Sequence, residues 1–375
     1  MTEVFVVNSG SSSLKYQLVD VESGEALVNG LVERIGEAGS QAKDHVAAMK
    51  IALDALGTGH EITAVGHRVV HGGEVFTEAT VITDKVEQQI EKLSPLAPLH
   101  NPANLTGIRA ARKALPGVPE VAVFDTAFHR TLAPAAYTYA IDAALANKYS
   151  VRRYGFHGTS YRYVSKRAAE FLGKPLADTK LIVLHLGNGA SACAIDGGVS
   201  VDTSMGMTPL EGLVMGTRSG DLDPAILSYL HRQAGLTFNQ LDDLLNHSSG
   251  LQGLTGSSDM RDVQTKATAG DATAEAALAV YRHRIRHYIG AYLVELGRLD
   301  ALVFTAGVGE NSAQLREQSL VGLAGLGISV DAARNAAKAS NERYISPDGS
   351  PVAVLVIPTN EELEIARQSV AALAG

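Results

Sequence analysis

The sequence repeats one structural unit, and this repeat constrains the fold more than any other feature. The first copy, VFVVNSGSSSLKYQLVD (residues 4–20), has the pattern of an apolar strand, a turn of small residues and a second strand. The second copy, LIVLHLGNGASACAIDGG (residues 181–198), has the same order, with Asp20 and Asp196 in matching places. We therefore expect a duplicated protein with one strand–turn–strand unit in each half.

The rest of the chain predicts further strands and helices around these units. A third small-residue turn, in LVFTAGVGENS (302–312), follows an apolar strand and precedes a helix that begins near Ser312. We expect strands over 63–70 and 118–129, and helices over 41–56, 160–172 and 361–373. The spacing of the first helix predicts one apolar face, formed by Val46, Met49, Leu53 and Leu56.

The chain of 375 residues is long enough for two domains. We expect the first domain to comprise residues 1–128 and 363–375, because the last helix can return to the first half, and the second to comprise 129–362. No Pro-rich or Ser-rich linker marks the boundary.

The composition favours a cytoplasmic globular enzyme or binding protein. The net charge of −8, from 32 basic and 40 acidic residues, argues against nucleic-acid and anionic-membrane partners. Aromatic residues make up 5% and Trp is absent, so platforms for stacking single-stranded bases are not expected. The single Cys193 cannot form an internal disulfide, which is consistent with a reducing compartment. We find no signal peptide and no apolar stretch of roughly 20 residues that would cross a membrane.

The small-residue turns are suited to binding phosphate. Gly, Ser and Asn let the backbone approach a ligand closely and direct several N–H groups toward it, and Lys15 would add a charge-assisted bond. The P-loop pattern is absent, and neither Gly187 nor Gly307 begins a complete G-x-G-x-x-G. Two phosphate cradles related by duplication predict a nucleotide held in an interdomain cleft.

Two other motifs were weighed against this interpretation. Ser12-x-x-Lys15 fits the acyl-transfer motif S-x-x-K, but the following residues predict a strand, and neither S-D-N nor K-T-G occurs. His67, His71 and Glu74 have a zinc-like spacing, but the two histidines would need one helical face, whereas Val69 and Val70 predict a strand that ends at Gly72 and Gly73. In a strand, too, the two histidines would share one face. There His67 and His71 would be about 13 Å apart, too far for one ion.

Motifs along the whole chain resemble those of the acetate kinases. They are VNSGSSSLK, GHRVVHGG, APLHNP, VFDTAFH, RYGFHGTS, HLGNGAS, DTSMGMTPLEGLVMGTRSGDLDP, SSDMRD, FTAGVGEN and TNEELEIAR, in that order. The resemblance implies an α/β fold of two duplicated ribonuclease H-like (actin-like ATPase) domains, each with a mixed five-stranded sheet flanked by helices. It also implies a homodimer that reversibly phosphorylates acetate with ATP, giving acetyl phosphate and ADP, and that needs Mg²⁺, for which Mn²⁺ could substitute.

Three departures from the family pattern are visible. The chain is shorter than typical members between Arg34 and Gly66. Tyr161 stands where many members have His, and Ala306 replaces a frequent Gly. The two substitutions would affect rate or nucleotide binding rather than the reaction itself.

Phosphoryl transfer to a carboxylate requires cations more than a general base. A small carboxylic acid has a pKa of roughly 4, so the nucleophile is already ionised at neutral pH. Arg68 and Arg218 fit this need, since a guanidinium binds carboxylate or phosphoryl oxygens bidentately. The resemblance directs Arg68 toward acetate and Arg218 toward the transferring group, and it implies that His157 bonds the equatorial phosphoryl oxygens.

The resemblance also implies the metal site and a catalytic aspartate. Asp125 matches that aspartate, and we expect it to position the metal or Arg68 rather than to remove a proton. Asn8 and Glu361 resemble the magnesium-binding pair, although Glu361 could equally serve as an N-terminal helix residue.

The remaining expected contacts follow the same motifs. Phosphates should meet Lys15, Ser11, Ser13 and the segment His185, Leu186, Gly187, Asn188 and Gly189. The adenosine side should meet Asp259, Met260 and Arg261, and the ribose and α-phosphate should meet Gly307, Val308, Gly309, Glu310 and Asn311. The acetate methyl pocket is expected at Val70, Leu99 and Pro209.

Two alternative functions remain open from the sequence. One extra methylene is worth only roughly 1–3 kcal/mol, so propionate should also react, and a propionate or butyrate kinase is the nearest alternative. A non-catalytic nucleotide-binding protein of the same superfamily is the other. Such a protein would not need Arg68 and Arg218 in an acceptor pocket.

Overall fold

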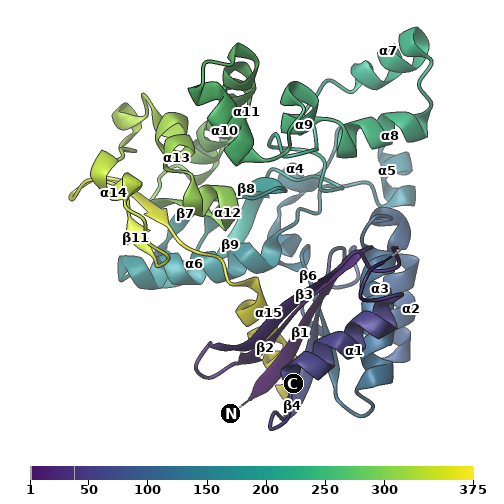
Figure 1. Ribbon diagram of the computed structural model, residues 1–375. Coiled ribbons are helices and arrows are strands. Elements are labelled where there is room, and N and C mark those ends of the chain that lie inside the picture. The colour runs from purple at the N-terminus through teal and green to yellow at the C-terminus, as the bar shows by residue number, and fades with distance from the viewer. Residues whose placement is uncertain (1, 38) are drawn as a thin grey trace. The chain divides into compact units, whose positions relative to one another are not determined.

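The computed structural model describes residues 2–37 and 39–375, which group into two compact units (Figure 1). Unit 1 contains the residues up to Arg130, together with Phe156–Tyr163 and Asn360–Gly375. Unit 2 contains Thr131–Gly155 and Val164–Thr359. Each unit is built on one mixed sheet flanked by helices, as the sequence predicts.

The sheet of unit 1 has the strand order β3-β2-β1-β4-β6-β5. Its first three strands form an antiparallel meander, and β4 and β6 continue the sheet parallel to β1. The strands are β1 (Glu3–Ser9), β2 (Ser13–Asp20), β3 (Ala26–Glu33), β4 (Ile62–Val69), β5 (Thr80–Val81) and β6 (Glu120–Phe124). The predicted strand over 118–129 is shorter than expected, because a 3-10 turn, η2 (Ala127–Thr131), replaces its last residues.

Both faces of this sheet are covered by helices because its strands alternate apolar residues between two cores. Phe5, Val7 and Leu14 pack with Met49 of α1 (His45–Leu56) on one face. Val4, Val6 and their neighbours pack with Ile365 of α15 on the other. The other helices of unit 1 are α2 (Asp84–Lys92), η1 (Ser94–Leu96), α3 (Asn101–Ala114) and α15 (Glu361–Ala374).

Helix α1 begins four residues later than predicted, and its buried face differs from the predicted one at Val46. Asp44 caps the helix by accepting a hydrogen bond from the Ala47 N–H at 2.8 Å. Met49 and Leu56 are buried as expected, whereas Val46 is 42% exposed. Val46 therefore lies outside the core, and the prediction for it was wrong.

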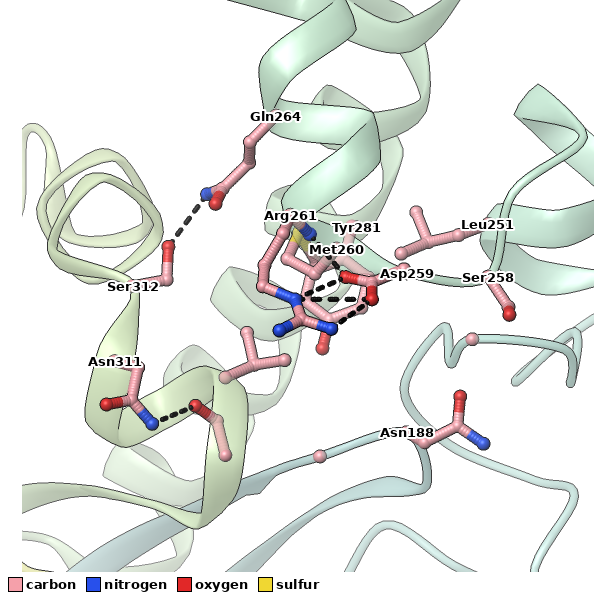
Figure 2. Close-up of a pocket in the computed structure, with 14 residues that line it drawn as sticks. Asn188, Leu251, Ser258, Asp259, Met260, Arg261, Gln264, Tyr281, Asn311 and Ser312 are labelled. Atoms are coloured by element: carbon pink, nitrogen blue, oxygen red, sulfur yellow. Dashed lines mark hydrogen bonds and ion pairs between the residues drawn. The ribbon is translucent and has the colours of Figure 1, made fainter.

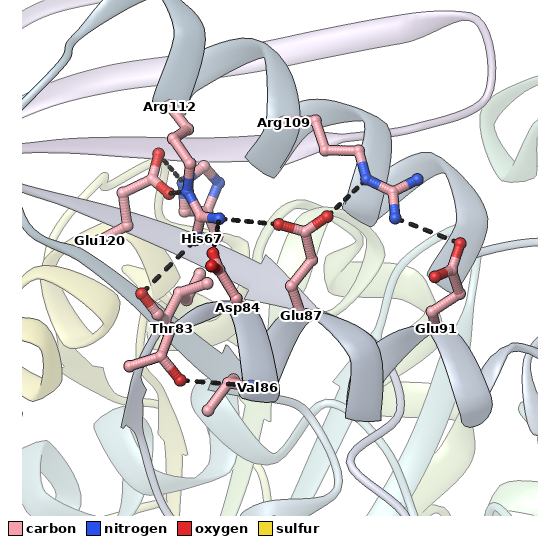
Figure 3. A network of polar contacts seen from close by, with 10 residues as sticks. His67, Thr83, Asp84, Val86, Glu87, Glu91, Arg109, Arg112 and Glu120 are labelled. Atoms are coloured by element: carbon pink, nitrogen blue, oxygen red, sulfur yellow. Dashed lines mark hydrogen bonds and ion pairs between the residues drawn. The ribbon is translucent and has the colours of Figure 1, made fainter.

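A charged network joins the α2–α3 pair of unit 1 to β6 (Figure 3). Arg112 on α3 contacts Asp84 and Glu87 of α2, and Glu120 of β6. Arg109, one turn earlier, contacts Glu87 at 2.6 Å. Because Glu87 of α2 accepts from both Arg109 and Arg112 of α3, the network holds the two helices together more firmly than a single exposed ion pair would.

Unit 2 repeats the topology of unit 1. Its strand order is β11-β12-β10-β7-β8-β9, so the β7-β8-β9 meander corresponds to β1-β2-β3. The strands are β7 (Lys180–Leu186), β8 (Ala190–Asp196), β9 (Val199–Thr203), β10 (Ala301–Thr305), β11 (Arg343–Tyr344) and β12 (Ala353–Val356). Asp20 pairs with Glu3 and Asp196 with Lys180, which are equivalent positions, so the predicted duplication is confirmed.

Each sheet has six strands rather than the expected five. The additional strands, β5 and β11, are two residues long and pair antiparallel with the last parallel strand of each sheet. The five-stranded core of the predicted fold is therefore present in both units, with one short edge strand added to each.

The long helix α11 (Ala272–Leu296) covers one face of the unit 2 sheet, packing on β7, β8 and β9. The other helices after Thr131 are α4 (Pro134–Tyr137), α5 (Ala143–Tyr149), α6 (Gly158–Leu172), η3 (Leu176–Asp178), α7 (Ala225–Ala234), α8 (Phe238–His247), α9 (Gly250–Thr255), α10 (Met260–Thr268), α12 (Ala306–Asn311), α13 (Ala313–Leu320), η4 (Ala324–Leu326) and α14 (Ala332–Ala336). In the parts of the chain that the structure describes, no helix combines the length and apolar character needed to cross a membrane.

The third small-residue segment is a helix and not a turn. Helix α12 begins at Ala306, directly after β10, and covers Gly307–Asn311. The helix expected near Ser312 is α13, for which the Ser312 hydroxyl accepts a hydrogen bond from the Leu315 N–H at 3.2 Å.

Candidate active site and nucleotide pocket

In unit 1, polar residues gather at the edge of the sheet where the parallel strands β1, β4 and β6 end. Asn8 lies near the end of β1, Arg68 near the end of β4, and Asp125 directly after β6. The Asp125 N–H donates to the Val69 carbonyl at 3.0 Å, which extends the ladder by one residue and fixes the start of the following turn. The carboxyl ends of parallel strands form the usual ligand-binding edge of an α/β sheet.

Arg68 and Asp125 form a bidentate ion pair at this edge. The Arg68 Nε lies 3.0 Å from Asp125 Oδ1, and Nη2 lies 2.6 Å from Oδ2. Asp125 is almost fully buried, whereas the Arg68 side chain keeps 21% of its surface exposed. Burial acts to lower the pKa of Arg68, but the Asp125 carboxylate more than offsets this and raises it. Arg68 is therefore a permanent cation held in one orientation.

One end of the Arg68 guanidinium remains available to a ligand. Among the described residues, none accepts a hydrogen bond from its Nη1, because Asp125 occupies only the Nε and Nη2 side. Because Asp125 binds only one edge of the planar Arg68 guanidinium, the other edge can form hydrogen bonds with a small carboxylate.

Glu361 begins α15, which Asn360 caps by accepting from the Leu363 N–H at 3.0 Å. Burial raises the pKa of Glu361 to about 7, with Arg68 and Lys15 acting in the opposite direction and Asp125 acting with it. Glu361 therefore interacts electrostatically with Arg68 and Asp125, although it lies 293 positions after Arg68 in the sequence. The predicted metal ligand and the predicted catalytic residues of unit 1 thus share one edge of the sheet.

The first small-residue turn lies beside them. Asn8 pairs with Lys15 across β1 and β2, and the Gly10 N–H donates to the Ser13 carbonyl at 2.8 Å to close the turn. The Lys15 ammonium forms an ion pair with Glu362. Ser11 is exposed and Ser13 is half-buried. A phosphate at this turn would therefore compete with Glu362 for Lys15.

His157 and the two apolar candidates of unit 1 differ in their surroundings. His157 has a positive φ of 56° and precedes Gly158, whose N–H donates to the Asp125 carbonyl at 2.9 Å. A Cβ at Gly158 would come within 2.2 Å of that carbonyl oxygen, so only glycine allows this close approach. Val70 is buried, whereas Leu99 is 47% exposed.

Unit 2 contains a pocket of about 540 Å³. Three predicted nucleotide segments contribute to it: the turn after β7, the start of α10 and helix α12. Its lining residues are Gly187, Asn188, Gly216, Leu251, Ser258, Asp259, Met260, Arg261, Gln264, Tyr281, Gly307, Val308, Asn311 and Ser312. The volume is within the range of pockets that hold small-molecule cofactors.

Four other residues predicted to bind the nucleotide, His185, Leu186, Gly309 and Glu310, do not line the pocket. His185 and Leu186 are buried within β7, and Gly309 packs beneath Phe304. Glu310 is half-buried and accepts a hydrogen bond from the Thr359 N–H at 3.1 Å. Burial raises the pKa of Glu310.

Two side-chain pairs form the polar rim of the pocket (Figure 2). Arg261 Nε lies 3.0 Å from Asp259 Oδ1, and hydrogen bonds from Arg261 lower the pKa of Asp259 to about 2. Gln264 Nε2 donates to the Ser312 hydroxyl at 2.7 Å. The Arg261 side chain is 89% exposed, so its guanidinium face is open to a ligand.

Several lining residues of the pocket were not predicted from the sequence. Gly216 lies two residues before the predicted Arg218, and a Cβ there would come within 2.0 Å of Asn188 Oδ1, which explains the glycine. Ser258 directly precedes the predicted Asp259. Leu251 and Tyr281 gave no signal, because an apolar or aromatic residue in a helix is usually a core residue.

Arg218 and Pro209 lie in the irregular segment between β9 and α7. The Arg218 Nη1 donates to the Pro209 carbonyl at 3.4 Å, and its own carbonyl accepts from the Met215 N–H at 3.1 Å. Both residues are half-buried, and neither lines the 540 Å³ pocket.

Asn8 and Glu361 of unit 1 carry oxygen donors of the kind that Mg²⁺ binds. Within residues 2–37 and 39–375, no group of three or more His, Cys, Asp or Glu side chains could hold a metal. Mg²⁺, however, keeps several waters and is commonly bound through one or two carboxylates and phosphate oxygens. The Glu361 carboxylate and the Asn8 amide oxygen are donors of this type.

The duplicated topology, with a meander followed by parallel strands in each unit, defines a protein of the ribonuclease H-like class. The chain belongs to the acetokinase family, whose family model matches residues 3–367. It is 62% identical to an acetate kinase of Leifsonia xyli subsp. xyli, and the alignment covers 100% of both chains.

Solved structures are similar over the same length. The crystal structure of Porphyromonas gingivalis acetate kinase matches with a TM-score of 0.95 and 43% identity, covering 100% of both chains. A propionate kinase from Francisella tularensis subsp. tularensis matches with a TM-score of 0.94 and 40% identity, covering 99% of this chain and 100% of that one.

Proposed function

We propose that this protein reversibly transfers the γ-phosphoryl group of ATP to acetate, giving acetyl phosphate and ADP. Membership of the acetokinase family and 62% identity to a full-length acetate kinase support the reaction. The structural observation that carries the proposal is the Arg68–Asp125 pair, which leaves part of a fixed guanidinium free for a carboxylate.

Each predicted site residue has a distinct role in this reaction. Acetate is already ionised at neutral pH, so its carboxylate attacks the γ-phosphorus directly and in line, without a general base. Arg68 holds the acetate, and Asp125 holds Arg68. Arg218 and His157 stabilise the charge on the transferring oxygens. Val70, Leu99 and Pro209 limit the size of the acid.

The nucleotide occupies the pocket of unit 2 in this proposal. Gly187 and Asn188 bind phosphate, Asp259 to Arg261 contact the adenosine, and Gly307 to Asn311 contact the ribose and the α-phosphate. Lys15, Ser11 and Ser13 assist at the phosphates. Asn8 and Glu361 would hold Mg²⁺, which when bound neutralises phosphate charge.

We also infer a domain division, an oligomeric state and a compartment. Acetate-side residues 1–128 and 363–375 would form one functional domain, and nucleotide-side residues 129–362 the other. The family resemblance supports a cytoplasmic homodimer. Tyr229 and Phe238, at the α7–α8 hairpin, are large and exposed, and a second copy could cover them. Light scattering of the purified protein would give the mass.

The decisive assay traps the product. With ATP, Mg²⁺ and millimolar acetate, hydroxylamine should yield acetohydroxamate at a rate that depends on all three components. No hydroxamate under these conditions would refute the proposal. A preference for butyrate over acetate in kcat/KM would instead correct the substrate, whereas some activity with propionate is expected.

A further inference from the structure

Tyr281 is an unassigned residue at the floor of the unit 2 pocket. It lies on α11, is 2% exposed and lines the pocket beside Met260 and Leu251. Figure 2 shows Tyr281 beside Met260 and the Asp259–Arg261 pair. None of the residues in the described ranges forms a hydrogen bond with this hydroxyl.

A buried hydroxyl without a partner is unfavourable. Leaving it unsatisfied costs folding free energy, and most buried polar atoms in native proteins are therefore bonded. An exception in a residue that lines a pocket suggests that the partner is a ligand. Burial raises the pKa of Tyr281, so the hydroxyl stays protonated and can both donate and accept.

The neighbouring polar side chains already have protein partners. Asp259 pairs with Arg261, and Gln264 donates to Ser312. The walls next to Tyr281 are otherwise formed by Leu251 and Met260. An apolar wall with one unsatisfied hydroxyl fits the nucleoside part of a nucleotide, which combines a flat apolar ring with donors and acceptors, better than it fits the charged phosphates.

We propose that the Tyr281 hydroxyl forms a hydrogen bond with the nucleoside of the bound nucleotide, through its base or its sugar. This inference deepens the proposed function and rests on it, because it assumes that the pocket takes ADP or ATP. Tyr281 is a binding residue and touches no reacting atom.

The same helix supplies a matched control. Tyr292 lies eleven residues, or about three turns, after Tyr281, and therefore on the same face of α11. It is 1% exposed, and its hydroxyl likewise has no hydrogen-bond partner among the described residues, but Tyr292 does not line the pocket. Tyr281→Phe and Tyr292→Phe thus each remove one buried, unpartnered hydroxyl.

Isothermal titration calorimetry with ADP tests the proposal on the full chain. Both variants should raise the melting temperature of the ligand-free protein. Only Tyr281→Phe should weaken ADP binding, by roughly three- to tenfold, the effect of losing one neutral hydrogen bond. In steady state, the KM for ATP should rise while kcat and the KM for acetate stay unchanged.

Further titrations identify the contact. If the hydroxyl meets the ribose 2′-OH, wild type and Tyr281→Phe should bind 2′-deoxyADP equally. If it meets the base, the preference of wild type for ADP over GDP should change in the variant. Unchanged ADP affinity in Tyr281→Phe, or an equal loss in Tyr292→Phe, overturns the proposal. ADP binding without any acyl phosphate formation would refute the proposed reaction and leave this inference standing.

Discussion

At the scale of single residues, the Arg68–Asp125 pair links stability to substrate binding. Asp125 is nearly inaccessible to water, so its carboxylate is satisfied mainly by one guanidinium. The same contact fixes the direction in which Arg68 presents its free N–H groups. Removing Asp125 therefore affects both the folded state and the acceptor site.

We expect Asp125→Ala to lower the free energy of unfolding by about 3–5 kcal/mol, because it leaves a partly buried cation unpaired. It should also raise the KM for acetate at least about tenfold, since Arg68 loses its fixed orientation. Urea denaturation and initial rates measure the two effects. Arg334→Ala is the control, because its exposed ion pair with Asp348 should be worth about 0–1 kcal/mol and its loss should leave the rates unchanged. Equal effects in both variants would contradict this account.

Ala306 shows the cost of a residue that departs from the family pattern. Its φ is +62°, in the left-handed region where a Cβ is crowded. Ala306→Gly should therefore raise the free energy of unfolding by about 0.5–1 kcal/mol. The substitution relieves the backbone strain, and this gain is partly offset because glycine makes the unfolded chain more flexible. Thermal unfolding would measure this change. Ala276→Gly, on the exposed face of α11, should change stability in the opposite direction, by about 1 kcal/mol. A destabilised Ala306→Gly variant would show that the strain argument fails.

At the scale of elements, helix α12 is held by a buried arginine of the next helix. Arg316 on α13 is 1% exposed and donates to the carbonyls of Gly309 and Glu310 at 2.9 and 2.8 Å. Its Nε donates to Asn335 Oδ1 at 2.8 Å. Carbonyls at the end of a short helix lack partners within the helix, and the planar guanidinium supplies several at once.

Arg316→Lys should consequently loosen α12 although it keeps the positive charge. A compact ammonium cannot reproduce the fork of bonds, so we expect a loss of about 2–3 kcal/mol in stability. The KM for ATP should rise severalfold, because Gly307 and Val308 of α12 line the pocket. Thermal unfolding and ATP titrations provide the measurements. Arg334→Lys, at an exposed pair with Asp348, should change neither quantity appreciably. Normal ATP kinetics in Arg316→Lys would show that α12 does not need this clamp.

At the scale of the whole molecule, buried carboxylates should set the acid limit of stability. Asp300 joins the starts of β7 and β10, accepting from Lys180 N–H and from Lys174 Nζ, both at 2.7 Å. Burial acts to raise the pKa of Asp300, but the bonds from Lys174, Lys180 and Arg298 outweigh it and lower the pKa. A carboxyl whose pKa is lower in the folded state stabilises the protein above its unfolded pKa of roughly 4.

This contribution should be lost as the pH falls below about 4, toward the lowered pKa of the folded state. We therefore expect the melting temperature of wild type to drop on acidification from about pH 5 to 3 more steeply than that of Asp300→Asn. Scanning calorimetry at several pH values would record both slopes. Asp54→Asn, on the exposed side of α1, serves as the control and should keep the wild-type slope. Identical slopes for wild type and Asp300→Asn would exclude Asp300 as a source of the acid sensitivity.

The structure also shows where local patterns mislead. The segment after β10 resembles the two small-residue turns, yet it forms α12. Arg316 of α13, itself bonded to Asn335, donates to the carbonyls of Gly309 and Glu310 and holds the end of this helix. Val46 has the correct helical spacing for the core, but the helix begins at His45 and leaves Val46 at its exposed first turn. In both cases the error arises because contacts outside the segment decide how it ends or which way it faces.

The duplicated strand–turn–strand units and the motif residues were readable from the chain alone, because alternation, small-residue turns and family motifs are local properties of the sequence. Only the tertiary structure shows that Glu361 interacts electrostatically with Arg68 and Asp125. Likewise, only the tertiary structure shows that Tyr281 lines a pocket and does not lie in a closed core. Such contacts join positions far apart in the sequence, and their energies depend on burial and distance, which no local pattern encodes.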